Sequence, residues 1–323
     1  MRVQKPGLHR MTAAEYHADP CAEPSLSASF LHLMLQRSPM HAVLQHPRLN
    51  PHFQPKPPSE EMEEGTAVHW MLFGGGGRPA IVEAPDWRTK AAQQLRATAR
   101  AQGRVALLGW RYRQLRRAAV AIRRELRATL DVPEGIDDGF AEAVLIWQED
   151  GLWCRCMVDW LPLGVVGMPA PLIDLKTTSR AATAEAFARA AIDLGHDIKA
   201  AWYRRGYRAV FGREPGPMVF LAAELEPPHG VSRLALGPEL EDLGERKVDA
   251  GLAMWKACLQ SGDWPGYPRR LGYVDAPRYA TPAWEIQSAR GAQQIRDGSR
   301  RRKDAAALKS AERVRQVIGG PVA

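Results

Sequence analysis

The sequence predicts an α/β protein built on one mixed sheet flanked by helices. Two segments with strand character, residues 140–147 and 152–161, flank an Asp-Gly dipeptide that is typical of tight hairpin turns. A third apolar segment carries Asp174 and Lys176 where it ends. Helical patterns precede and follow these strands, and this order is typical of a sheet covered by helices.

Composition narrows the class of protein. The 323 residues are 45% hydrophobic and 25% charged, as in ordinary globular domains, and the net charge of +8 is compatible with a polyanionic partner. The four cysteines form no CxxC pair, which argues against a zinc ribbon or an iron–sulfur cluster and favours reduced core residues. The N-terminus lacks a secretory leader pattern, and no apolar run approaches the roughly 20 residues that span a bilayer. We therefore expect a cytoplasmic protein with no membrane association.

The N-terminal part is predicted to be an entry segment followed by helices. Residues 1–24 are polar and form the entry segment, and a single domain is expected over 25–284. Ser27 or Ser29 can cap a helix that ends at a proline. A glutamate-rich start then opens a helix with His69 among apolar neighbours.

Residues 87–130 have a helical pattern with one apolar stripe. Arginines, including Arg116 and Arg123, fill the remaining face. The pattern leaves two interpretations open, a solvated helix face and a phosphate-binding surface.

Helices are predicted again after the third strand. We expect two helices over 181–195 and 196–212, the first capped by Thr178 or Ser179. Two strands follow within 216–237, and a helix covers 239–262. The last part, 285–323, is a basic tail whose role as a docking helix, a DNA-binding arm or a disordered segment stays open.

The chemistry is predicted where two strands end. Side chains alternate along a strand, so Asp174 and Lys176 point the same way, and Asp159 ends the preceding strand. If these strands pair, Asp159 and Asp174 lie side by side, where their carboxylates repel each other and resist desolvation. A divalent cation such as Mg²⁺ or Mn²⁺ offsets both effects, and Lys176 could stabilise negative charge on a phosphate. The alternative is an exposed Asp–Lys ion pair at a strand end.

An acid that ends one strand, followed by DxK on the next, resembles the pattern of the PD-(D/E)xK nuclease superfamily. Further pieces resemble RecE-type, exodeoxyribonuclease VIII-like phage and prophage exonucleases. In chain order these pieces are LSASFLHLMLQRSPMH, GTAVHWMLF, RCMVDWLP, IDLKTTSRA, AAWYRRGY and WPGY. The resemblance covers roughly residues 22–285 and implies a restriction-endonuclease-like core.

The resemblance implies roles for individual residues. Lys176 would be the catalytic lysine, and Glu142 would bind a second metal ion or a water molecule. His69 would approach the metal site from its helix. The implied metal ligands are Asp159, Asp174 and the carbonyl of Leu175.

Phosphate contacts are implied for a second group of residues. Ser27 and Ser29 could bind phosphate, although helix capping explains them equally well. Tyr203 keeps its expected place, whereas Lys199 stands where relatives usually have Gln. This departure changes the local charge and puts the activity in doubt.

The implied function is a Mg²⁺-dependent exodeoxyribonuclease, with Mn²⁺ as a possible substitute. It would digest one strand of a duplex from its 5′ end and leave a 3′ single strand for an annealing protein, as a homo-oligomeric ring around DNA. Arg116, Arg123 and the basic tail could add phosphate contacts. Two alternatives stay open, a DNA-binding or recombination-accessory protein with weakened catalysis and a repair endonuclease on the same core.

Overall fold

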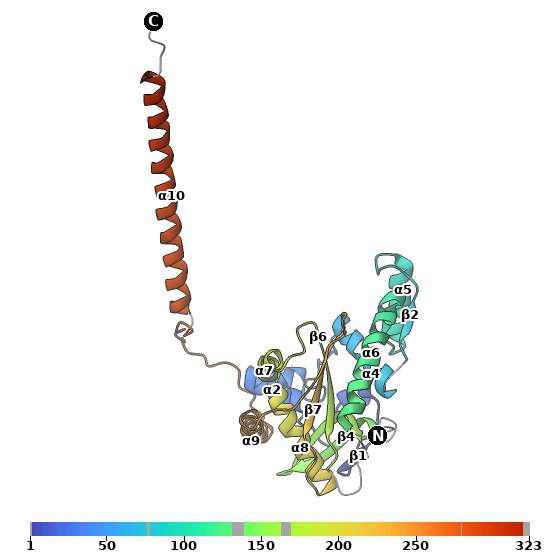
Figure 1. Cartoon of the computed structure of the whole chain (residues 1–323). Helices are drawn as coiled ribbons and strands as arrows, with labels where there is room; N and C mark the ends of the chain where they lie inside the picture. The colour runs from blue at the N-terminus through green and yellow to red at the C-terminus, as the bar shows by residue number, and fades with distance from the viewer. Residues whose placement is uncertain (1, 76–77, 131–138, 163–168, 279, 319–323) are drawn as a thin grey trace. The chain divides into compact units, whose positions relative to one another are not determined.

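The computed structural model describes residues 2–75, 78–130, 139–162, 169–278 and 280–318 (Figure 1). The chain divides into two compact units, Met1–Tyr267 and Pro268–Ala323. We call them the sheet unit and the C-terminal unit and describe each by itself.

The sheet unit contains a mixed six-stranded sheet in the order β1-β4-β5-β6-β7-β8. Neighbouring strands are antiparallel except β6 and β7, which are parallel. This arrangement confirms the predicted α/β fold with one mixed sheet. The strands are β1 (Gly7–His9), β4 (Gly139–Glu149), β5 (Leu152–Pro162), β6 (Leu172–Thr178), β7 (Met218–Glu224) and β8 (Val231–Leu234).

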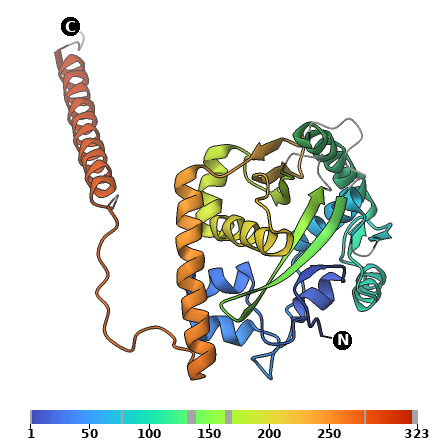
Figure 2. The ribbon, with the colours of Figure 1, turned by 90° about the horizontal axis from the view of Figure 1, so that it is seen from below.

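Helices cover both faces of the sheet (Figures 1 and 2). On one face, apolar side chains of β4 to β7 pack against α2, α7, α8 and α9, and α3 packs beside α2 and α9. On the other face, β5 to β7 pack against α4 and α6. The helices are α1 (Ala13–His17), α2 (Ala28–Gln36), α3 (Pro39–Gln45), α4 (Glu60–Phe73), α6 (Gly109–Leu130), α7 (Ala184–Asp193), α8 (His196–Phe211) and α9 (Pro238–Ser261).

The predicted hairpin joins β4 and β5. Asp150 and Gly151 both have positive φ, 51° and 81°, which is the backbone conformation that a two-residue hairpin turn requires. The two strands pair from Gly139 with Pro162 to Glu149 with Leu152. The hairpin prediction is therefore confirmed.

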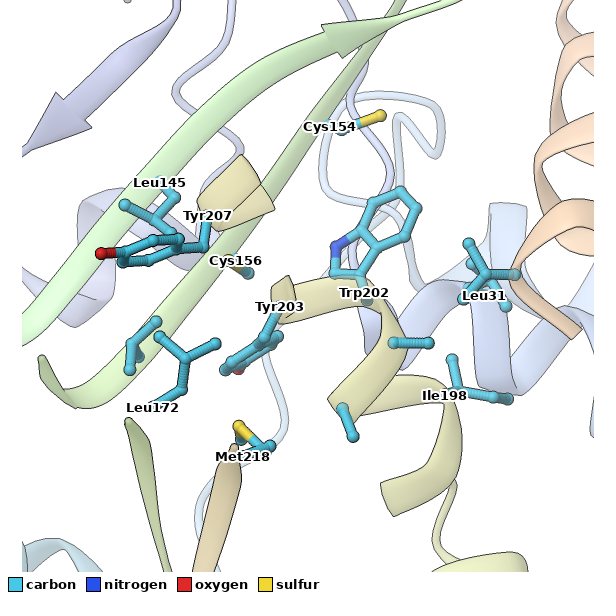
Figure 3. Packing of buried hydrophobic residues seen from close by; sticks show 14 of the residues in the cluster. Leu31, Leu145, Cys154, Cys156, Leu172, Ile198, Trp202, Tyr203, Tyr207 and Met218 are labelled. Atoms are coloured by element: carbon cyan, nitrogen blue, oxygen red, sulfur yellow. The ribbon is translucent and has the colours of Figure 1, made fainter. Parts of the chain in front are cut away.

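The core between the sheet and α8 is rich in aromatic and sulfur-containing side chains (Figure 3). Trp202 is fully buried, and its indole N–H donates to the carbonyl of Arg155 on β5 at 2.9 Å. This bond fixes α8 over the strand that carries Asp159. All four cysteines are free and buried, as the sequence predicts for core residues.

Residues 1–24 contribute an edge to the sheet. β1 pairs with β4 through Gly7–His9, and Tyr16 and Cys21 are buried against β4 and β5. Leu26 then forms a β-bridge with Cys154. The chain therefore enters α2 from a position fixed on the sheet.

The continuous helical pattern predicted over 87–130 is wrong in its middle. α5 (Lys90–Ala101) ends before Gly103, which has a φ of 68°. The apolar residues of β3 (Ala106–Leu108) then pair in parallel with β2 (Ala80–Val82). Tertiary pairing here overrides the helical pattern, and α6 starts only at Gly109.

The predicted caps also need correction. α7 begins at Ala184 and is capped by Thr183, whose hydroxyl accepts the N–H of Ala186, rather than by Thr178 or Ser179. Thr178 instead accepts the N–H of Arg180. Ser27 occupies the N-cap position of α2, but among the described residues its hydroxyl makes no capping bond.

The C-terminal unit contains the helix α10 (Ala280–Ile318). Its described side chains are almost all exposed, and several of them, including Arg300 to Lys303, are basic. None of the described helices is both long and apolar enough to cross a membrane.

Candidate functional site

The pairing of β5 with β6 brings two acids to neighbouring strands. Trp160 pairs with Ile173 in antiparallel register, so the next positions, Asp159 and Asp174, lie opposite each other. Oδ2 of Asp159 accepts the backbone N–H of Leu175 at 2.8 Å. The two strands therefore pair, which is the condition under which the sequence analysis places Asp159 beside Asp174.

Asp174 is fully buried and carries two ammonium groups. Nζ of Lys176 contacts its Oδ2, and Nζ of Lys199 contacts its Oδ1. Burial alone raises the pKa of the Asp174 carboxyl, but the two lysines outweigh burial and hold that pKa well below its usual range. Asp174 is therefore a carboxylate at neutral pH.

The two lysines respond differently to this shared partner. Burial and the charge of Lys199 lower the pKa of Lys176, with Asp174 opposing them. For Lys199, burial acts in the same sense, but Asp174 outweighs it and raises the pKa well above its usual range. Lys199 therefore keeps its positive charge next to Asp174.

His69 and Glu142 approach Asp159 from α4 and β4. Nε2 of His69 lies 3.5 Å from Oδ2 of Asp159. Glu142 occupies the β4 position opposite Asp159 and has a φ of 49°. Its carboxyl group lies directly against Gly75, so that a Cβ added at Gly75 would come within 2.8 Å of the carboxyl carbon. Burial raises the pKa of Glu142, and Asp159 adds to this effect while His69 opposes it. This part of the site therefore favours added positive charge.

The donor chemistry fits a hard divalent cation, although the donors are divided. Carboxylates of Asp159, Asp174 and Glu142 with a nearby imidazole are ligands that suit Mg²⁺ or Mn²⁺. Within the described ranges, however, no three His, Cys, Asp or Glu side chains already form a cation-binding group. Both oxygens of Asp174 contact lysines, and the carbonyl of Leu175 lies 3.4 Å from Nζ of Lys176.

A cleft opens beside these charges. Asp159, Lys176, Lys199 and Tyr203 line it together with the start of α2. Nζ of Lys199 lies 4.9 Å from the centre of the Tyr203 ring. The two serines predicted to bind phosphate, Ser27 and Ser29, line the same cleft, with their hydroxyl oxygens 3.0 Å apart.

The two arginines of the predicted phosphate surface lie elsewhere. Arg116 and Arg123 belong to α6 on the opposite face of the sheet, and in the described part of the chain neither lines this cleft. Arg123 donates to the carbonyl of Met71 at 2.7 Å. On the same helix, Arg111 is held by Glu64 and Glu226.

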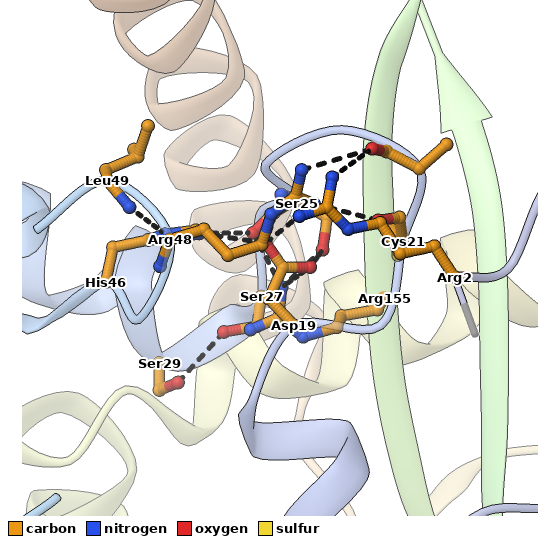
Figure 4. Close-up of polar contacts among 11 residues, drawn as sticks. Arg2, Asp19, Cys21, Ser25, Ser27, Ser29, His46, Arg48, Leu49 and Arg155 are labelled. Atoms are coloured by element: carbon orange, nitrogen blue, oxygen red, sulfur yellow. Dashed lines mark hydrogen bonds and ion pairs between the residues drawn. The ribbon is translucent and has the colours of Figure 1, made fainter. Parts of the chain in front are cut away.

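Sequence reasoning missed a buried polar network behind the cleft (Figure 4). Arg155 is only 2% exposed and donates to Asp19 at 3.1 Å and to the carbonyl of Ser25 at 2.7 Å. Nε2 of His46 lies 3.3 Å from Asp19. The network fixes the segment that leads to Ser27. A charged residue between Cys154 and Cys156 of an apolar strand was the available signal.

His196 is a second residue that the sequence did not single out. It starts α8, is nearly buried and lines the cleft. Burial, together with the charge of Lys176, lowers its pKa to about 3, so the ring is neutral near pH 7. It therefore contributes hydrogen-bonding atoms rather than charge.

A six-stranded mixed sheet whose paired strands present an acid and a DxK lysine beside a cleft has the core of PD-(D/E)xK nucleases. Residues 35–277 match the family model of a PDDEXK-like domain of unknown function, DUF3799. The match covers most of the chain, and the chain therefore belongs to this PDDEXK-like family.

One solved structure supports the fold. A candidate exonuclease from Eubacterium rectale is similar to the chain with a TM-score of 0.54 and 12% identity, over 83% of this chain and 97% of that chain. At this identity the likeness shows the shared fold. The structure of SSO0001 has a TM-score of 0.30 and 11% identity, over 80% of this chain and 93% of that chain, which is too low to support an argument. No curated protein matches the chain.

Proposed function

We propose that the protein is a metal-dependent exodeoxyribonuclease. One observation carries this proposal: Asp159 and Asp174 lie on paired strands, and Asp159 and Lys176 line a cleft together with Ser27 and Ser29. An acid, an amine and hydroxyls in one cleft are groups that can support metal-assisted phosphodiester hydrolysis.

The proposed cation is Mg²⁺, with Mn²⁺ as a substitute. PD-(D/E)xK nucleases generally use such divalent metals. When bound, the cation supplies an acidified water molecule and neutralises phosphate charge. The residues proposed to hold it are Asp159, Asp174, His69, Glu142 and the carbonyl of Leu175.

The protein's own side chains act on the phosphate. Lys176 stabilises the negative charge that grows on the phosphate oxygens during hydrolysis. Ser27 and Ser29 donate hydroxyl hydrogen bonds to a neighbouring phosphate and so orient the strand. Both serines enter the cleft at the start of α2, where the backbone N–H groups also favour an anion.

The resemblance to RecE-type exonucleases extends the proposal. The substrate would be an end of double-stranded DNA, digested from 5′ to 3′, and the product would be a 3′ single strand for an annealing protein. A homo-oligomeric ring would keep the enzyme on DNA. The ordered set of motifs from residue 22 to 285 supports these points.

A second candidate is a recombination-accessory protein that binds DNA with weakened catalysis. The contact of Lys199 with Asp174 favours it, because this ammonium competes with a cation for the same carboxylate. Duplex binding without hydrolysis would then be the main activity.

Incubation with linear and covalently closed duplex DNA tests these functions. The exonuclease releases nucleotides from the linear substrate alone, in the presence of Mg²⁺, and Asp174→Asn and Lys176→Met abolish the release. Cutting of closed circles would indicate an endonuclease. Equal hydrolysis by wild type and both variants would exclude this cleft as the active site, and Mg²⁺-independent binding without hydrolysis would favour the accessory protein.

A further inference from the structure

Two ammonium groups that line the cleft share one carboxylate buried beneath it, that of Asp174. Lys176 belongs to the same strand as Asp174, whereas Lys199 comes from α8 and reaches the other oxygen. The lysine side chains keep only 25% and 20% of their surface exposed, and Asp174 keeps none. Lys199 is therefore part of the centre and not a surface residue near it.

The position of Lys199 follows from how α8 is fixed. Trp202 anchors the middle of the helix to β5 through the carbonyl of Arg155. At its first turn, Asp197 is fully buried and bound by Lys247 of α9. Tyr203 lies one turn after Lys199, and its ring packs against the ammonium at 4.9 Å. These contacts hold the Lys199 side chain over Asp174.

The charges of the centre show what Lys199 changes. Asp159 and Asp174 contribute two negative charges, and Lys176 and Lys199 contribute two positive ones. A neutral side chain at position 199 would leave these four residues with one net negative charge, next to the Glu142 carboxyl. An entering cation would be attracted by that charge, but Lys199 cancels it.

We propose that the Lys199 ammonium is a built-in cation that holds one oxygen of Asp174 and limits the centre to a single divalent ion, bound on the side of Asp159 and His69. This inference rests on the proposed function, since it assumes that Asp159 and Asp174 take part in binding a divalent cation. In this arrangement Lys199 supplies, on its side of Asp174, the positive charge that a second ion would bring to the phosphate.

Counting bound Mn²⁺ tests the inference without any measurement of activity. The full-length protein is titrated with MnCl₂ in the absence of DNA, and free Mn²⁺ is followed by its electron paramagnetic resonance signal. The variants are Lys199→Gln and, as a matched control, Lys247→Gln. The control removes an ammonium from a different fully buried aspartate, Asp197 of α8. Circular dichroism verifies that each variant is folded.

We expect one Mn²⁺ per wild-type chain, and in Lys199→Gln either a second ion or an affinity at least about tenfold tighter, equal to roughly 1.4 kcal/mol. Lys247→Gln should match wild type. Binding by Lys199→Gln alone would contradict the inference, because the wild type would then hold no ion. If Lys199→Gln binds like wild type or more weakly, or if both variants tighten binding equally, the inference is wrong and the proposed function is unaffected. If neither the wild type nor the two variants bind Mn²⁺, both the inference and the proposed metal-dependent function fail.

Discussion

The carboxylate of Asp159 accepts the backbone N–H of Leu175 at 2.8 Å, on the strand that carries Asp174. This bond lies next to the pairing of Trp160 with Ile173. At this point a side chain of β5, rather than its backbone, accepts the N–H of β6. Asp159 therefore has a structural role as well as its proposed role in cation binding, and substitutions can separate the two.

Asp159→Asn should keep the fold and lose the activity. An amide oxygen still accepts the N–H of Leu175, but it carries no charge for a cation. We expect a melting temperature within about 3 °C of wild type and nucleotide release at least about 10²-fold slower. Asp159→Ala should also lose about 1–3 kcal/mol of unfolding free energy, because the N–H loses its partner. Wild-type hydrolysis by Asp159→Asn would remove Asp159 from the proposed centre.

Arg155→Met should destabilise the sheet unit strongly. The substitution leaves the buried Asp19 carboxylate without its strongest cationic neighbour, and we expect a loss of about 3–5 kcal/mol in urea unfolding. Arg246→Met is the matched control, since Arg246 and Asp242 form an exposed pair worth less than about 1 kcal/mol. The double variant Asp19→Asn with Arg155→Met should lose less than the sum of the single losses. Strict additivity would show that the two residues are not coupled.

Stability should fall as the pH drops from 7 to 5 because of His46. Burial lowers the pKa of this fully buried ring to about 4, and its Nδ1 accepts the N–H groups of Arg48 and Leu49. The unfolded chain binds a proton near pH 6.5, so between about pH 6.5 and 4 it holds more protons than the folded chain. The folded state is therefore favoured above this window and loses about 2 kcal/mol by pH 5.

Urea unfolding at pH 7 and pH 5 measures this effect. His46→Asn keeps an acceptor near the position of Nδ1 but does not titrate, so its loss between the two pH values should be smaller by about 2 kcal/mol. An equal loss in wild type and His46→Asn would assign the pH dependence to other groups, such as His196.

Removal of α10 and the residues that follow it should weaken DNA binding in a salt-dependent way. Residues 295–323 carry eight Lys or Arg and three Asp or Glu. Each phosphate that the protein no longer neutralises should reduce the slope of log K against log [salt] by about 0.9. A chain that ends at residue 279 should show a slope smaller by about 3 or more, as expected if the tail neutralises several phosphates. An unchanged slope, measured by fluorescence anisotropy with a labelled duplex, would exclude the tail as a DNA-binding arm.

The central strands were predictable because their signals are local. An Asp-Gly turn between two alternating segments marked the β4–β5 hairpin, and the apolar run before Asp174 marked β6. The interruption of the helical pattern at β3 was not predictable, since it depends on pairing with the distant β2.

The site was predictable only in part, for a similar reason. The spacing of Asp159, Asp174 and Lys176 along two strands is visible in the sequence, and their proximity follows from one strand pairing. The contact between Lys199 and Asp174 depends on how α8 crosses the sheet, which no local pattern encodes. The Asp19–Arg155 pair joins residues 136 positions apart and was missed for the same reason.

The most direct test of the proposed centre is the anomalous scattering of Mn²⁺ in crystals of the wild-type protein. We predict one peak per chain within about 2.5 Å of a carboxylate oxygen of Asp159, with Lys199 still in contact with Asp174. A map with no peak near Asp159, from crystals in which Mn²⁺ is bound elsewhere, would contradict a metal-dependent nuclease centre at this position.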